Sequence, residues 1–190
     1  MSLTKEDGKI LIQAAREGIE YFFEFEEVPT VLKTVDLDAY SELRGVFVTL
    51  KKKGELRGCI GFPLPTYKLG DAVVKASISA AFEDYRFSPL KKDELKDITI
   101  ELSVLSIPEI IEVDDPSEYL KKIKIGRDGL IIEYLGHTGL LLPQVPEEQD
   151  WTVEEYLEGL CMKAGLPPGS WSEEGVVLKS FQAQIFEEEK

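Results

Sequence analysis

The chain has 190 residues, of which 43% are apolar and 31% charged, a balance typical of a folded globular protein rather than a disordered one. Acidic residues outnumber basic residues by 36 to 22, which gives a formal net charge of −14. A surface this acidic repels phosphate backbones and anionic lipids, so we expect neither nucleic acid nor a membrane as a partner.

The sequence also constrains cellular location and metal content. No apolar run approaches the ~20 residues of a membrane span, and no signal-peptide pattern is present. Two cysteines are too few for a disulfide framework, so we expect a cytoplasmic protein. Few Cys and Met, abundant Lys and Glu, and no asparagine give a thermophile-like composition. A single histidine argues against a multi-histidine metal site, and we expect neither a metal nor a cofactor.

The first half of the chain is predicted to contain two helices and a β-hairpin. Apolar residues at helical spacing, with Thr4 and Asp7 as a capping box, predict a helix over residues 4–25. β-Branched and apolar residues around a lysine-rich turn predict a hairpin with strands at 46–50 and 55–62. A second apolar stripe predicts a helix over residues 69–82.

The second half is predicted to contain several strands and one helix. Alternating apolar and polar residues predict a half-buried strand over 98–105. Further strands are expected at 123–125, 130–135, 139–145 and 181–185. Thr152 and Glu155 form a capping box that begins a helix ending at Ala164. Without a regular strand–helix–strand alternation, this pattern indicates an α+β fold, with helices packed on an antiparallel sheet.

The densest candidate for chemistry is the sequence Leu56-Arg57-Gly58-Cys59-Ile60-Gly61. On a regular strand, Arg57, Cys59 and Gly61 would share one face, and Leu56, Gly58 and Ile60 the other. A guanidinium near a thiol favours the thiolate, and glycines leave room for a ligand. Cys59 and Arg57 are therefore candidate catalytic residues, and Gly58 and Gly61 candidate ligand-binding residues. The alternative is a buried structural cysteine between closely packed glycines, which residue statistics alone favour.

Three further places in the sequence are weaker candidates. Asp84 and Arg86, in the segment 80–89, could orient a polar ligand, although an ion pair at a helix end explains them more simply. Glu101 lies on the non-core face of its predicted strand and could act as a general base in a covered site; a solvated face is the simpler interpretation. Gln144 could direct its amide at a ligand, or it could belong to a buried edge strand.

Seven segments, taken in chain order, resemble the signature of a known family. They lie at residues 45–50, 56–61, 84–90, 101–105, 126–130, 139–145 and 161–167. Together they make the chain similar to the AMMECR family, and specifically to an archaeal or bacterial member, over roughly residues 8–187. The hexapeptide at 56–61 is the most specific of these segments.

The resemblance implies an α+β fold of two unequal subdomains, the larger built from both ends of the chain. With a boundary at the proline-rich segment 63–65, we expect the larger subdomain to contain residues 1–62 and 123–190 and the smaller one residues 63–122. The resemblance also implies a genomic association with a Memo-type protein and a radical-SAM protein. It brings no reaction and no catalytic residues.

Two functional hypotheses follow. The first is an enzyme or enzyme component with a cleft centred on Cys59 that acts on an unknown anionic or polar substrate. The alternative is a non-catalytic interaction or regulatory module that works with a Memo-type or radical-SAM partner, in which the acidic surface would attract a basic partner. The sequence leaves the oligomeric state open.

Overall fold

The computed structural model describes residues 3–189 and confirms the expected α+β class. The chain forms two compact units: the first contains the residues up to Leu105 together with those from Gln184 on, and the second spans Ser106–Ala183. This division differs from the boundaries expected from the sequence, because residues 98–105 pair with residues 46–52 in one sheet. Among the described residues, no helix combines the length and apolar character needed to cross a bilayer.

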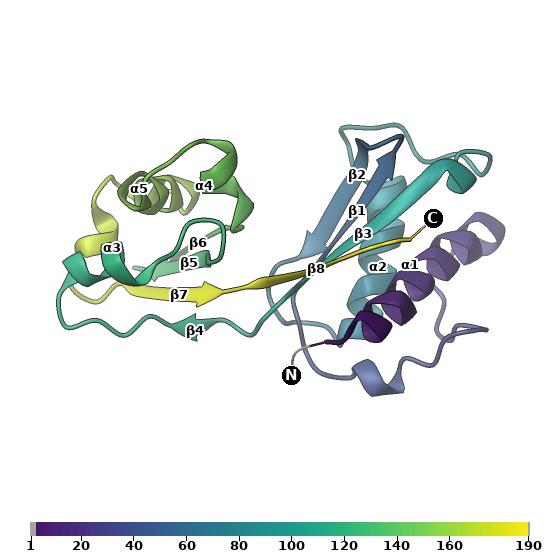
Figure 1. Cartoon of the computed structure of the whole chain (residues 1–190), viewed down its shortest axis with the longest axis horizontal. Coiled ribbons are helices and arrows are strands. Elements are labelled where there is room, and N and C mark those ends of the chain that lie inside the picture. The colour runs from purple at the N-terminus through teal and green to yellow at the C-terminus, as the bar shows by residue number, and fades with distance from the viewer. Residues whose placement is uncertain (1–2, 190) are drawn as a thin grey trace. The chain divides into compact units, whose positions relative to one another are not determined.

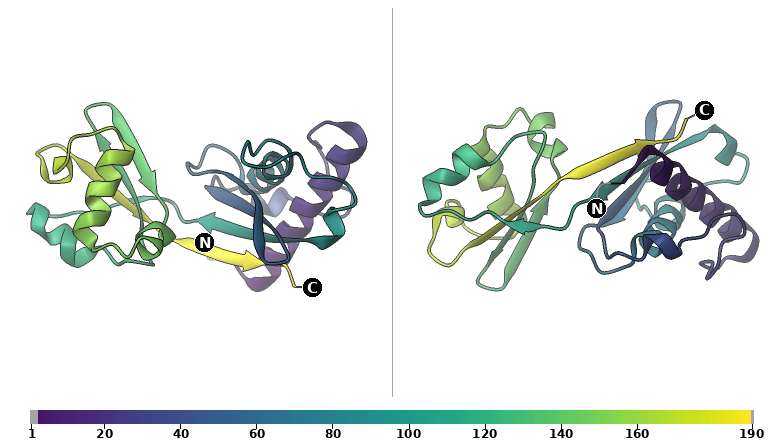
Figure 2. Two further views of the ribbon diagram at one scale, coloured as in Figure 1. Left: turned by 90° about the horizontal axis from the view of Figure 1, so that it is seen from above. Right: turned by 60° about the horizontal axis from the view of Figure 1, so that its bottom comes forward.

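The first unit is a four-stranded sheet covered by two helices (Figure 1). Its strands are β1 (Val46–Lys52), β2 (Glu55–Phe62), β3 (Ile98–Leu105) and β8 (Ala183–Glu187), in the order β2-β1-β3-β8. β1 is antiparallel to both β2 and β3. Helices α1 (Lys5–Phe25) and α2 (Leu69–Phe82) share one hydrophobic core with these strands, so both pack on the same face of the sheet (Figure 2).

Local sequence explains these elements. The Thr4 hydroxyl accepts a hydrogen bond from the Asp7 N–H, and the Asp7 carboxylate accepts one from the Thr4 N–H, so the predicted capping box of α1 is confirmed. On β1, Val46, Val48 and Leu50 are fully buried beneath the helices, while the residues that alternate with them are half-buried on the opposite face. This second face carries the candidate site.

The second unit has its own sheet and core. Its strands are β4 (Glu109–Ile110), β5 (Gly129–Tyr134), β6 (His137–Leu141) and β7 (Val177–Phe181), in the order β4-β7-β5-β6. Its helices are α3 (Tyr119–Lys122), α4 (Gln144–Glu148) and α5 (Val153–Lys163). Helix α5 packs on β5 and β6, and Cys161 is fully buried in that core.

Three predicted elements of the second half require correction. Residues 123–125 form no strand, because Ile123 caps the C-terminus of α3 and is buried in the core. The strand expected over 139–145 ends at Leu141, since Pro143 precedes the first turn of α4. The C-terminal strand is replaced by two strands, β7 and β8, which are separated at Gln182.

The turn between β5 and β6 places a leucine in the left-handed region. Leu135 has a φ of 48° and is 79% exposed. A Cβ atom costs about 1 kcal/mol in this conformation, which asparagine tolerates better. We expect Leu135→Asn to raise the free energy of unfolding by about 0.5–1 kcal/mol, measured by urea denaturation. Leu135→Ala keeps the Cβ and should change little; equal stability of the Asn and Ala variants would contradict the explanation.

Candidate functional site

Cys59 lies on β2, at the edge of the first unit's sheet, and is half-buried. Thr49 on β1 is directly opposite Cys59, and Glu101 on β3 is directly opposite Thr49. The three side chains therefore form one row on the sheet face that is turned away from the helices, with neighbouring Cα atoms about 5 Å apart. The Thr49 hydroxyl donates a hydrogen bond to Cys59 Sγ at 3.3 Å. The row places a thiol, a hydroxyl and a carboxylate side by side.

The loop after α2 holds the backbone of Cys59 from the open side of the strand. The Cys59 N–H donates to Asp84 Oδ2 at 2.9 Å, and the Cys59 carbonyl accepts from Arg86 Nη2 at 3.2 Å. Arg86 also donates to both oxygens of the Asp84 carboxylate, at 2.9 Å from Nε and 2.7 Å from Nη2. Asp84 and Arg86 therefore form a clip that fixes the edge strand at Cys59.

The electrostatics of this clip follow from its geometry. The Asp84 side chain is 2% exposed, whereas that of Arg86 is 44% exposed. Hydrogen bonds from the Arg86 guanidinium, and from the Cys59 backbone, hold the pKa of the Asp84 carboxyl well below its usual range. The ion pair also raises the pKa of Arg86. A guanidinium that stays charged is thus held beside Cys59.

The two glycines of the motif permit close packing on opposite sides of β2. A Cβ at Gly58 would collide with the backbone carbonyl of Ala80 in α2. A Cβ at Gly61 would collide with the Val46 carbonyl and the Phe47 ring. Both positions are therefore filled by the protein's own atoms, and the space expected for a ligand above Gly61 is occupied by Phe47.

Arg57 departs from the alternation expected for a regular strand. The register of β1 and β2 shifts between Leu50 and Lys51, a β-bulge that leaves Arg57 without a partner on β1. Arg57 instead binds Glu94, with Nη2 to Oε2 at 3.0 Å. The same bulge places Leu56 opposite Lys51, and Leu56 is 45% exposed rather than grouped with the core.

Glu94, which binds Arg57, also binds Lys52. Lys52 Nζ lies 2.7 Å from Glu94 Oε1. The hydrogen bonds from Arg57 and then Lys52 lower the pKa of Glu94 to about 2. The charge of Arg57 is thus offset by Glu94, and among the described residues the side-chain hydrogen bond to Cys59 Sγ comes from Thr49.

Glu101 is engaged in an ion pair. Its Oε2 lies 2.8 Å from Lys51 Nζ, which also binds Glu187 at 3.2 Å. The hydrogen bond to Glu101 raises the pKa of Lys51. Glu101 would have to leave Lys51 before it could accept a proton from a substrate.

Gln144 belongs to the second unit, where it begins α4. Its Oε1 is buried, and it has no hydrogen-bond partner among the described residues. In the same unit, His137 Nδ1 lies 3.1 Å from the carbonyl oxygen of Ala164, at the end of α5. His137 thus has a structural contact at a helix end.

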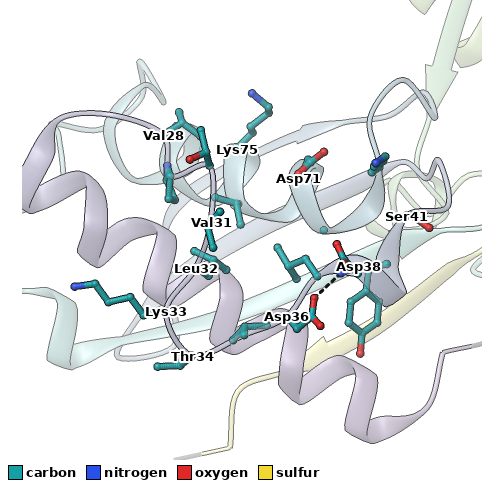
Figure 3. A pocket seen from close by; sticks show the side chains of 18 residues that line it. Val28, Val31, Leu32, Lys33, Thr34, Asp36, Asp38, Ser41, Asp71 and Lys75 are labelled. Atoms are coloured by element: carbon teal, nitrogen blue, oxygen red, sulfur yellow. Dashed lines mark hydrogen bonds between the residues drawn. The ribbon is translucent and has the colours of Figure 1, made fainter.

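A cleft of about 810 Å³ lies elsewhere in the first unit, between the segment 28–41 and α2 (Figure 3). Its lining combines apolar side chains such as Val31 with charged ones such as Asp71 and Lys75. None of the lining residues belongs to the Cys59 row or to the clip. Within residues 3–189, no group of three or more His, Cys, Asp or Glu side chains is placed to hold a metal ion.

Thr49 and Glu94 are the members of this arrangement that the sequence does not indicate. Thr49 is one polar residue within the expected strand 46–50, which is only a weak signal. Glu94 lies outside every motif, in the turn before β3. Their partners are fixed by strand register and by the loop after α2, neither of which appears in the sequence pattern.

Comparisons with known proteins extend over nearly the whole chain. The AMMECR1 family model matches residues 12–186. A protein of Methanocaldococcus jannaschii is 50% identical over 188 residues, which cover 98% of this chain and 92% of that protein. One of Thermococcus onnurineus is 49% identical over 189 residues, covering 97% and 91%. The crystal structure of an uncharacterised protein from Pyrococcus horikoshii matches with a TM-score of 0.83 and 45% identity, covering 98% of this chain and 94% of that one.

Proposed function

This chain belongs to the AMMECR1 family, and we propose that Cys59 is the reactive centre of an enzyme or enzyme component that acts on an anionic or polar substrate. One observation carries the proposal. The thiol of Cys59 is half-buried and accepts a hydrogen bond, and the guanidinium of Arg86 binds the backbone carbonyl of the same residue. A hydrogen-bond donor to the sulfur favours the thiolate, which is the nucleophilic form of cysteine.

The proposal gives the surrounding residues distinct roles. Cys59 is the nucleophile or covalent carrier. Arg86 binds the anionic group of the substrate, because within residues 3–189 no hydrogen bond involves its Nη1, whose N–H donors remain available. Arg57 has a smaller role, since Glu94 offsets its charge. Glu101 is a proton acceptor once it separates from Lys51.

The remaining predicted residues have supporting roles in the proposal. Gly58 and Gly61 allow the close packing that positions Cys59. Gln144 is a separate ligand-binding candidate, supported by its unpartnered buried oxygen. We further propose a cytoplasmic location, because a reducing compartment preserves a free thiol.

Alkylation of the folded protein tests the reactivity of Cys59. Iodoacetamide is added at about pH 7, and modified peptides are quantified by mass spectrometry. We expect Cys59 to react several-fold faster than N-acetylcysteine, whereas the fully buried Cys161 stays unmodified and reports that the protein remains folded. A Cys59 that reacts only after unfolding would contradict the proposal, as would a Cys59→Ala variant that keeps a measured biological activity.

The charge preference of the site has its own test. Iodoacetate and iodoacetamide carry the same leaving group, but only iodoacetate is anionic. We expect the ratio of their rates at Cys59 to fall in Arg86→Gln and to stay unchanged in Lys92→Gln, which removes the same charge from an exposed lysine in the same part of the chain. Equal ratios in the two variants would remove Arg86 from the substrate site.

The exposed ring of Tyr85 favours a second candidate function, a protein-interaction module. Tyr85 lies between the two residues of the clip and is 94% exposed. Aromatic residues are common anchors at interfaces, and the net charge of −14 would attract a basic partner. We expect Tyr85→Ser to weaken capture of a co-expressed Memo-type or radical-SAM protein at low salt, without slowing alkylation of Cys59. No capture at low salt would count against this function.

A further inference from the structure

The pairing of Thr49 with Cys59 belongs to the closer of the two kinds of antiparallel residue pair. The N–H and C=O of Cys59 are used by Asp84 and Arg86, so neither group is directed at β1. Residues that face each other without exchanging backbone hydrogen bonds have Cα atoms about 4.5 Å apart, and their side chains approach more closely than in the hydrogen-bonded pairs. The clip on the open edge therefore brings the Cys59 side chain close to that of Thr49.

We infer that Thr49 is a positioning residue for Cys59, and that its hydroxyl stabilises the Cys59 thiolate by donating a hydrogen bond to Sγ. The donor–acceptor distance is 3.3 Å. Threonine is branched at Cβ and has few accessible rotamers on a strand, so the hydroxyl is already oriented before the thiol ionises. This inference rests on the proposed function, because it concerns the activation of the same thiol.

The charged groups of the row, of the clip and of Arg57, taken with their ion-pair partners, balance one another, which leaves Thr49 as the distinguishing contact. They come from β1, β2, β3, β8 and the segment 84–94. The cations are Lys51, Lys52, Arg57 and Arg86, and the carboxylates are Asp84, Glu94, Glu101 and Glu187. Every member is in at least one ion pair, so four positive charges face four negative ones. Paired opposite charges largely cancel at a distance, whereas the hydroxyl touches the sulfur directly.

Two matched variants separate the hydroxyl from the shape of the side chain. Thr49→Val keeps the branched shape and removes the donor, whereas Thr49→Ser keeps the donor and removes a methyl group. Alkylation of Cys59 is measured at about pH 7 and again at about pH 10, where thiols are ionised, and the ratio of the two rates reports the thiolate population at pH 7. Ultraviolet absorbance of the thiolate, referenced to Cys59→Ser, gives a second measurement that needs no reagent access.

We expect Thr49→Val to lower the rate ratio about tenfold, the effect of one lost hydrogen bond to a charged group, and Thr49→Ser to keep it within about twofold. A Val variant equal to the parent, or a Ser variant that loses as much as the Val variant, overturns the inference. These results leave the proposed function intact when the parent Cys59 remains fast. A parent Cys59 that reacts no faster than Cys161, and shows no thiolate absorbance at pH 7, overturns both.

Discussion

Gly58→Ala is expected to lower the free energy of unfolding by about 3 kcal/mol, at the upper end of the effects of added core atoms. The new Cβ would collide with the backbone carbonyl of Ala80. A carbonyl within α2 cannot rotate away as a flexible side chain can, so either the helix or the strand must shift. Urea denaturation followed by circular dichroism measures the loss.

The matched control for this variant is Gly54→Ala. Gly54 lies in the β1–β2 turn with a φ of +84°, and among the described residues only its two chain neighbours would lie within 4 Å of a Cβ at that position. Its substitution therefore carries only the cost of the left-handed conformation, about 1 kcal/mol. A Gly58→Ala loss no larger than that of Gly54→Ala would show that α2 and β2 are not in close contact.

Asp84→Ala is expected to lower the free energy of unfolding by about 2 kcal/mol, because it removes the acceptor for a backbone N–H and for a guanidinium. The value is discounted because Arg86 is partly exposed and can be solvated by water. Asp84→Asn keeps an acceptor oxygen and should lose about half as much. Asp93→Asn, an exposed carboxylate in the next loop, should change stability by less than about 0.5 kcal/mol. Equal effects at Asp84 and Asp93 would contradict the role of the clip.

The lowered pKa of Asp84 predicts that the stability of the protein depends on pH. The pKa of Asp84 is lowered by folding, so its stabilising contribution is complete above the unfolded value of about 3.9 and is lost as the pH falls below it. We expect the urea midpoint of the parent protein to fall more steeply below about pH 4 than that of Asp84→Asn. Glu94, whose pKa is lowered to about 2, contributes equally to both proteins. Parallel pH curves for the two proteins would contradict the assignment.

The sequence indicated several parts of the site separately but not how they combine. Cys59 and Arg86 were both candidates, in motifs 27 residues apart. Hydrophobic periodicity assigns each segment to a strand or a loop, but it carries no information on which loop covers which strand edge. The contact between the Arg86 guanidinium and the Cys59 carbonyl exists because α2 returns the chain to the open edge of β2.

Arg57 departs from the regular strand alternation for a definable reason. A regular hairpin that pairs Lys52 with Glu55 would place Thr49 opposite Gly58. In the bulge, Arg57 is an extra residue without a partner, which moves the register by one residue, so that Thr49 faces Cys59. A single extra residue thus decides which side chain contacts the thiol, and the sequence pattern contains no clear signal for it.

The sequence by itself determined the α+β class, the helices α1, α2 and α5, the β1–β2 hairpin and the family, because periodicity, capping boxes and motifs are local properties of the chain. Tertiary structure alone decided the division into units, since residues 98–105 join the first unit by pairing with β1 across a long stretch of sequence. It also decided the neighbours of Cys59, because the register set by the bulge and the loop that closes the strand edge depend on packing between distant segments.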